Sequence, residues 1–213
     1  MHALEALGFI ARYFSPSDFE AVMEAAGKPD DALRAERPRL DRWPDSMAHI
    51  RKPLQDAADA ALAGFDALRD APEQPDGVRA AFRALRYAPR AQEALYALAA
   101  KFPPVSNFFL EPGQRHDAAL LARFDQVQAT PDPGIIHVGN EPGSRGGFSM
   151  YVPEYYTPDR PWPLVVALHG GSGNGRGFLW SWLRDARSHG AILIAPTATG
   201  GTWALMGEDT DTP

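Results

Sequence analysis

A glycine cluster that directly follows an apolar run holds the residues of this sequence best placed to do chemistry. The run at residues 164–168 is followed by His169, Gly170, Gly171, Ser172 and Gly173. Glycines at such a turn let main-chain N–H groups converge on a negative charge, because they adopt unusual dihedral angles and allow close approach. The cluster predicts an anion-stabilising loop, with a plain packing turn between strand and helix as the alternative.

A phosphate cradle is one use of such a loop, and the spacing does not favour it. Gly170 and Gly175 have the separation of a Walker loop, but Arg176 and Gly177 follow in place of Lys and Ser or Thr. Arg176 also stands where the third glycine of the dinucleotide fingerprint belongs. The sequence therefore gives little support to nucleotide binding.

Stabilisation of an oxyanion is the other use. Acyl transfer builds negative charge on a carbonyl oxygen, and preorganised N–H donors stabilise that charge. We expect the main-chain amides of Gly171 and Ser172 to be these donors, with Gly170 shaping the turn. Trp203 follows the next strand, so it is a candidate for lining a substrate pocket, with ordinary packing as the equal alternative.

The elements around this loop predict an α/β sheet. The apolar run at 164–168, an amphipathic helix at 178–189 and a second apolar run at 191–195 form a βαβ unit with two parallel strands. Segments 135–138 and 148–152 predict an antiparallel hairpin ahead of it. The strand at 164–168 is apolar throughout, which is typical of a strand covered on both faces.

The amino-acid composition changes along the chain, and this change predicts two domains. Residues 1–130 are rich in Ala, Leu and Arg and predict an all-helical domain, with helices at 4–14, 19–26 and 47–68 and a proline-broken stretch at 28–44. Residues 131–213 are rich in Gly, Pro and β-branched residues and predict the α/β part. The Pro-rich joint at 130–134 is the expected boundary.

Composition narrows the classes of partner and cofactor. The net charge of −6 argues against nonspecific nucleic-acid binding, and the absence of Cys excludes thiolate metal sites and a Cys nucleophile. The six His lack ligand spacing, so we expect no metal site. Without a basic, apolar leader or a stretch of about 18 apolar residues, we expect a soluble, cytoplasmic protein with no transmembrane segment.

Three segments together resemble the opening of an α/β-hydrolase. Residues 148–153, 163–171 and 192–196 are similar to the antiparallel strands, the third strand ending in His-Gly-Gly, and the fourth strand ending in Pro of that superfamily. The nearest group is the phospholipase/carboxylesterase and polyhydroxyalkanoate-depolymerase-like esterases. The resemblance implies a serine hydrolase that cleaves small-molecule or lipid esters with no cofactor, and gives His169 a supporting role beside the oxyanion hole.

The nucleophile, acid and base that complete the active site in that family are not recognisable in this sequence. The nucleophile elbow Gly-x-Ser-x-Gly is absent, so we expect residues 131–213 to be the amino-terminal half of a hydrolase domain, truncated before the elbow. A triad made from residues present would have to pair Ser172 with His137, His169 or His189. The acidic run Glu208, Asp209 and Asp211 could bind a cation or cap a helix that follows it, and capping or solvation is the favoured interpretation.

Two functions stay open at this level. The chain is either part of a serine carboxylester hydrolase, with nucleophile, acid and base outside it, or a non-catalytic helical interaction module with a degenerate hydrolase remnant. The fourth strand is expected to present an open edge, which a partner or a missing carboxyl-terminal half would complete.

Overall fold

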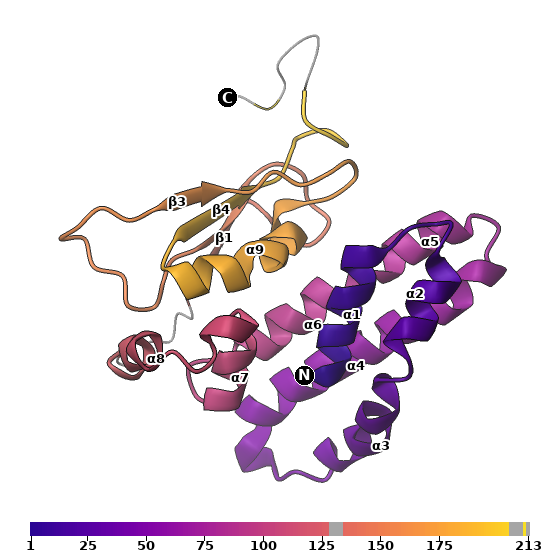
Figure 1. Ribbon diagram of the computed structural model, residues 1–213, viewed down its shortest axis with the longest axis horizontal. Helices are drawn as coiled ribbons and strands as arrows, with labels where there is room; N and C mark the ends of the chain where they lie inside the picture. Colours follow the sequence, from indigo (N-terminus) through magenta and orange to yellow (C-terminus); the bar gives the residue numbers. More distant parts are fainter. Residues whose placement is uncertain (128–133, 205–210, 212–213) are drawn as a thin grey trace. The chain divides into compact units, whose positions relative to one another are not determined.

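The computed structural model describes residues 1–127, 134–204 and 211 (Figure 1). The chain divides into two compact units, Met1–Leu98 and Ala99–Pro213. This division lies ahead of the Pro-rich segment at residues 130–134, where the sequence predicted the boundary. Residues 99–127 therefore belong to the unit that contains the sheet.

The first unit is helical, as predicted. Its helices are α1 (His2–Tyr13), α2 (Phe19–Ala26), α3 (Asp30–Leu40), α4 (Ala48–Asp70), α5 (Gly77–Ala84) and α6 (Tyr87–Tyr96). The long α4 packs against α1, α3, α5 and α6. Its fully buried core residues include Leu7, Ile10, Phe65, Leu68 and Tyr96. In the described part of the chain, no helix is both long and apolar enough to span a bilayer.

Helix α3 corrects the prediction that prolines break residues 28–44. Asp30 and Asp31 lie in its first turn, Arg37 and Arg39 in its last, and Pro38 is accommodated near the end. Ion pairs to α4 hold this helix in place: Arg34 to Asp66 at 2.6 Å and Arg37 to Asp59 at 2.5 Å. The charged residues thus favour a helix at a position where the local proline pattern opposed one.

The second unit begins with two short helices, α7 (Pro103–Phe108) and α8 (Ala118–Asp125). Asp117 caps α8 by accepting hydrogen bonds from the Ala119 and Leu120 amides at 2.9 and 3.0 Å. A buried arginine, Arg187, donates to the Ser106 carbonyl at 2.8 Å and so fastens α7 to the later α/β segment. This contact explains why residues 99–127 group with the sheet.

A mixed sheet follows, with strands β1 (Ile135–Val138), β2 (Phe148–Tyr151), β3 (Leu164–Val166) and β4 (Ile192–Pro196). Their order is β1-β2-β4-β3. Strand β2 is antiparallel to both β1 and β4, while β3 and β4 are parallel and joined through α9 (Gly175–His189). The predicted hairpin and βαβ unit are confirmed. The predicted open edge at the fourth strand is wrong, because β4 lies between β2 and β3.

The sheet has one covered and one exposed face. Helix α9 packs against β2 and β4 (Figure 1), where Tyr151, Leu193 and Ala195 are fully buried. On the opposite face, cross-strand register aligns Ile136, Met150, Ile194 and Val166 in one row. Val166 is 56% exposed and Ile136 37%. The prediction that the third strand is covered on both faces is therefore wrong for the residues described.

Candidate functional site

The glycine cluster lies in the loop between β3 and α9, at the carboxyl end of the two parallel strands. Asn174 caps α9, its side-chain oxygen accepting from the Gly177 amide at 2.7 Å. The main chain at Gly175 passes so close to β4 that an added Cβ would lie 2.0 Å from the Ala195 carbonyl oxygen. The Gly175 amide donates to the Thr197 hydroxyl at 2.8 Å, which fixes the start of the helix against the sheet.

His169 is buried, and both of its ring nitrogens are engaged. Its Nε2 lies 3.1 Å from the Ala198 amide, which can only donate, so Nε2 accepts and carries no proton. The proton of the neutral ring is then on Nδ1, which donates to the Gly170 carbonyl at 2.7 Å. The imidazole therefore ties the loop after β3 to the segment after β4, which is a supporting role.

Trp203 lies against His169. The two ring centroids are 4.9 Å apart with an interplanar angle of 35°, and the indole Nε1 donates to the His169 carbonyl at 2.8 Å. This contact gives Trp203 a packing role that reinforces the loop. Its side chain is only partly buried, and its predicted part in a substrate pocket stays a prediction.

The two amides predicted to form an oxyanion hole differ in their surroundings. Ser172 adopts a left-handed conformation with φ of 58°, and its amide donates to the Gly201 carbonyl at 2.6 Å. Gly171 is exposed, and its amide has no acceptor within hydrogen-bond distance among the described residues. In this conformation Gly171 offers the available donor, while the Ser172 donor is already engaged.

Two charged residues hold the neighbouring segments, and one of them, Arg145, was not singled out by the sequence analysis. Arg145 donates from Nη1 to the Gly173 carbonyl at 2.6 Å and from Nη2 to the Gly200 carbonyl, so it links both loops. Asp211 accepts from the Thr199 amide at 2.9 Å and from the Ala204 amide at 2.6 Å. The sequence predicted that the acidic run caps a following helix or is solvated; Asp211 instead accepts main-chain amides of the loop after β4, and Glu208 and Asp209 lie outside the described residues.

A chain of polar side chains runs beneath the site. His137 Nδ1 lies 2.7 Å from the Ser149 hydroxyl, to which Asn140 Nδ2 donates at 2.9 Å. The Thr197 hydroxyl donates to Asn140 Oδ1 at 3.0 Å and accepts the Gly175 amide. Ser149, Asn140 and Thr197 are buried. These residues connect β1 and β2 to the start of α9, and no local sequence pattern groups them because they come from separate segments.

The contacts described for the three candidate histidines are with groups other than Ser172. His169 uses both ring nitrogens, as described above. His137 lies against Ser149, and His189 Nδ1 lies 2.9 Å from the Asp185 carbonyl near the end of α9. Each histidine thus has another partner, and the side chain of Ser172 is exposed in a turn.

Comparisons with protein-family models, with curated proteins and with solved structures found no match to this chain. The geometry of the loop and the physical chemistry of its residues therefore carry the functional argument.

Proposed function

We propose that this chain supplies the oxyanion-stabilising loop of a serine hydrolase that cleaves carboxylic esters. The Gly171 amide carries the proposal: it is exposed at the carboxyl end of β3, with no acceptor among the described residues. In open α/β sheets, reacting groups bind beyond the carboxyl ends of the strands. A main-chain donor there is placed to meet the negative charge of a tetrahedral intermediate.

The loop around Gly171 supports the proposal because it is preorganised. An oxyanion donor is effective when its position is fixed before the reaction, so that little reorganisation accompanies charge development. His169 Nδ1 donates to the Gly170 carbonyl, Trp203 Nε1 donates to the His169 carbonyl, and Arg145 donates to the Gly173 carbonyl. The Ser172 amide becomes a second donor only if the Gly201 carbonyl moves away from it.

The order of elements also favours an α/β-hydrolase identity. An antiparallel hairpin precedes β3, His169 and two glycines follow β3, and β4 ends at Pro196. This is the order of the esterase group that the sequence resembles. On this proposal, polypeptide outside the 213 residues provides the nucleophile, acid and base, and the substrate is a small-molecule or lipid ester.

The test uses the protein isolated from its source cells. Its intact mass is compared with 23.2 kDa, and its hydrolysis of p-nitrophenyl butyrate and of phosphatidylcholine is measured. We expect hydrolysis of at least one ester by a species heavier than this chain or by a complex that contains it. No hydrolysis of either ester would overturn the proposal.

Two substitutions at one position then test the donor itself. Gly171→Pro removes the amide hydrogen, whereas Gly171→Ala keeps it, and an added Cβ meets no heavy atom within 4 Å. We expect Gly171→Pro to lower kcat by about 10²–10³-fold relative to Gly171→Ala. Equal kcat values for the two variants would exclude Gly171 as the donor. Matching thermal unfolding curves would show that both variants fold.

The engaged Ser172 amide favours one alternative: a non-catalytic helical interaction module with a degenerate hydrolase remnant. An oxyanion hole with one of its two predicted donors bonded to Gly201 is weaker than a complete hole. A stable, soluble 23.2 kDa monomer without ester hydrolysis would support this alternative. The same pair of measurements therefore separates the two functions.

A further inference from the structure

A second concave site lies in the sheet-containing unit, at the other end of the parallel strands. Its cavity of about 550 Å³ is lined by the end of α8 and by the loop that precedes β3. Because β3 begins at Leu164 and the loop ends beside it, this site is at the amino end of β3, opposite the end that carries His169. The volume falls in the range of small-molecule sites, roughly 300–1,000 Å³.

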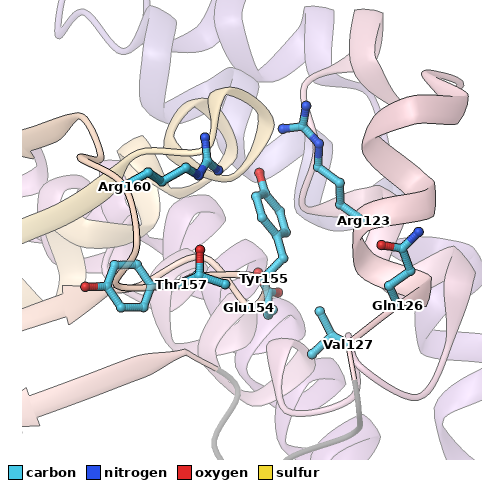
Figure 2. A pocket seen from close by; sticks show the side chains of 8 residues that line it. Arg123, Gln126, Val127, Glu154, Tyr155, Thr157 and Arg160 are labelled. Atoms are coloured by element: carbon cyan, nitrogen blue, oxygen red, sulfur yellow. The ribbon is translucent and has the colours of Figure 1, made fainter.

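Two arginines face this cavity. Arg123 comes from α8 and Arg160 from the loop, and Figure 2 shows them on either side of Tyr155, with their guanidinium groups at the same end of the pocket. Neither arginine has an ion pair within the described ranges. Both are solvent-exposed. Two positive charges therefore reach the pocket without an ion-paired carboxylate among residues 1–127, 134–204 and 211.

Aromatic rings support both guanidinium groups. The Arg160 Cζ lies 3.8 Å from the Trp162 ring centroid, and the Arg123 Cζ lies 5.7 Å from that of Tyr155. Such cation–π contacts restrict where the guanidinium points without occupying the N–H groups at its edge. Those N–H groups remain available for the bidentate geometry in which guanidinium recognises carboxylate and phosphate.

The acidic groups nearest the pocket are already engaged. Glu154 lines it, but one carboxylate oxygen accepts from Arg187 Nε at 2.9 Å and the other from the Tyr151 hydroxyl at 2.7 Å. Asp159 accepts from the Thr157 hydroxyl. The charge of Glu154 is thus balanced inside the wall by a buried arginine. Among the residues that line the cavity, the charged side chains without an ion pair in the described part of the chain are thus Arg123 and Arg160.

We propose that this pocket binds a small organic anion through a carboxylate or phosphate group held between Arg123 and Arg160. The rings of Tyr155 and Tyr156 line the same cavity and offer apolar surface to the body of the ligand. Gln126 and Thr157 add polar groups at its edge. This site is independent of the proposed ester hydrolysis, because it uses none of the residues of the His169 loop.

The experiment is isothermal titration of the full 213-residue chain at constant ionic strength. Glutarate represents the carboxylates, phenyl phosphate represents the phosphates, and benzamide is a neutral aromatic control. We expect saturable binding of glutarate or phenyl phosphate and none of benzamide. The anion that binds more tightly shows whether the site prefers a carboxylate or a phosphate group. Absence of binding of both anions at about 10 mM, well above ordinary ligand affinities, would overturn the proposal.

Matched variants locate the binding. Arg123→Gln and Arg160→Gln should each weaken binding by about tenfold or more, since each removes charge-assisted hydrogen bonds. Arg160→Lys keeps the positive charge but lacks the planar guanidinium that binds an anion through two N–H groups. This variant should therefore also bind the anion more weakly. Arg79→Gln, an exposed arginine of the first unit, makes the same charge change and should leave affinity unaltered. Equal weakening by Arg79→Gln would show nonspecific charge attraction and refute the site.

Discussion

Replacing Arg187 by Met should destabilise the sheet-containing unit more than most single substitutions do. Its side chain is 2% exposed and pairs with Glu154, which is 13% exposed, at 2.9 Å. Its guanidinium also donates to the Ser106 carbonyl and hydroxyl at 2.8 and 2.9 Å and lies 4.0 Å from the centre of the Phe124 ring. Arg187→Met removes all of these contacts and leaves a largely buried carboxylate without its cation.

Breaking a buried ion pair by removing one partner costs about 3–5 kcal/mol. We expect a loss of this size for Arg187→Met, a large share of the roughly 5–15 kcal/mol that stabilises a typical domain. Glu154→Gln combined with Arg187→Met should recover about 1–3 kcal/mol of that loss. The neutral amide no longer needs a cation and still offers an acceptor to the Tyr151 hydroxyl.

Urea denaturation followed by tryptophan fluorescence measures these changes. Trp43 is the tryptophan of the first unit, so a Trp43→Phe background leaves Trp162, Trp180, Trp182 and Trp203 to report on the second. Arg184→Met is the matched control on the same helix, because Arg184 is partly exposed and lies over Phe108. We expect it to cost less than about 1 kcal/mol. A loss below 1 kcal/mol for Arg187→Met, or a double variant that costs the sum of both singles, would refute the reasoning.

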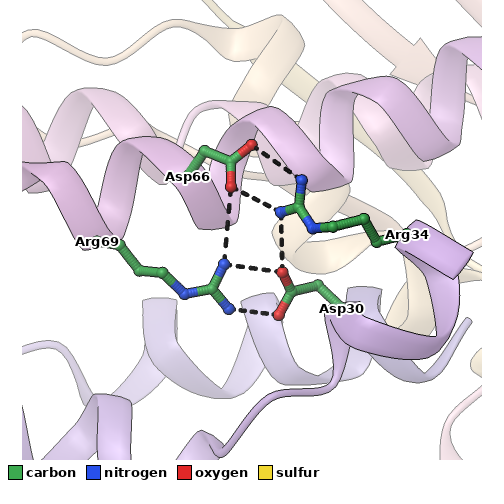
Figure 3. Close-up of polar contacts among 4 residues, drawn as sticks. All are labelled: Asp30, Arg34, Asp66 and Arg69. Atoms are coloured by element: carbon green, nitrogen blue, oxygen red, sulfur yellow. Dashed lines mark hydrogen bonds and ion pairs between the residues drawn. The ribbon is translucent and has the colours of Figure 1, made fainter.

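Two further predictions concern acid stability and backbone packing. Hydrogen bonds from Arg69 (Figure 3) lower the pKa of Asp30, although burial of the carboxylate acts in the opposite direction. The ionised carboxylate therefore stabilises the folded protein above the pKa that Asp30 has in the unfolded chain, and this stabilisation is lost as the pH falls. Amide hydrogen exchange in α4 should therefore accelerate below about pH 5. Asp30→Asn should make the exchange rate depend less on pH. An unchanged pH profile in this variant would exclude Asp30 as the cause. Gly175→Ala would place a Cβ 2.0 Å from the Ala195 carbonyl oxygen and should cost about 1–3 kcal/mol in urea denaturation. Gly113→Ala, with open space around the added Cβ, should cost less than about 1 kcal/mol; equal losses for the two alanines would contradict the steric argument.

Local sequence patterns were sufficient for the sheet and its loop. Short apolar runs bounded by Gly and Pro located β1 to β4, and the position of His169 after β3 followed from the end of one such run. These features depend on neighbouring residues, so periodicity and turn chemistry reveal them.

Contacts between distant residues set the limit of that approach. Helix α3 forms despite its prolines because Arg34 and Asp30 reach partners 32 and 39 residues away on α4. Asn140 and Thr197, which meet beneath the site, are 57 residues apart. The Gly201 carbonyl that engages the Ser172 amide comes from a separate loop, after β4. Local patterns contain none of this information, so the availability of each predicted donor could not be predicted from sequence.

The exposed face of the sheet bears on the choice between the two functions. Parallel strands are ordinarily covered on both faces, and β3 has the apolar sequence of such a strand. Yet Leu164, Val166 and Leu168 are 58%, 56% and 55% exposed, and α9 lies against the opposite face. An apolar surface of this kind favours association with another layer. If another layer of the native protein covers this face, the sheet is part of a larger domain, as the proposed hydrolase function requires. A soluble monomer that keeps the face exposed would instead favour the non-catalytic alternative.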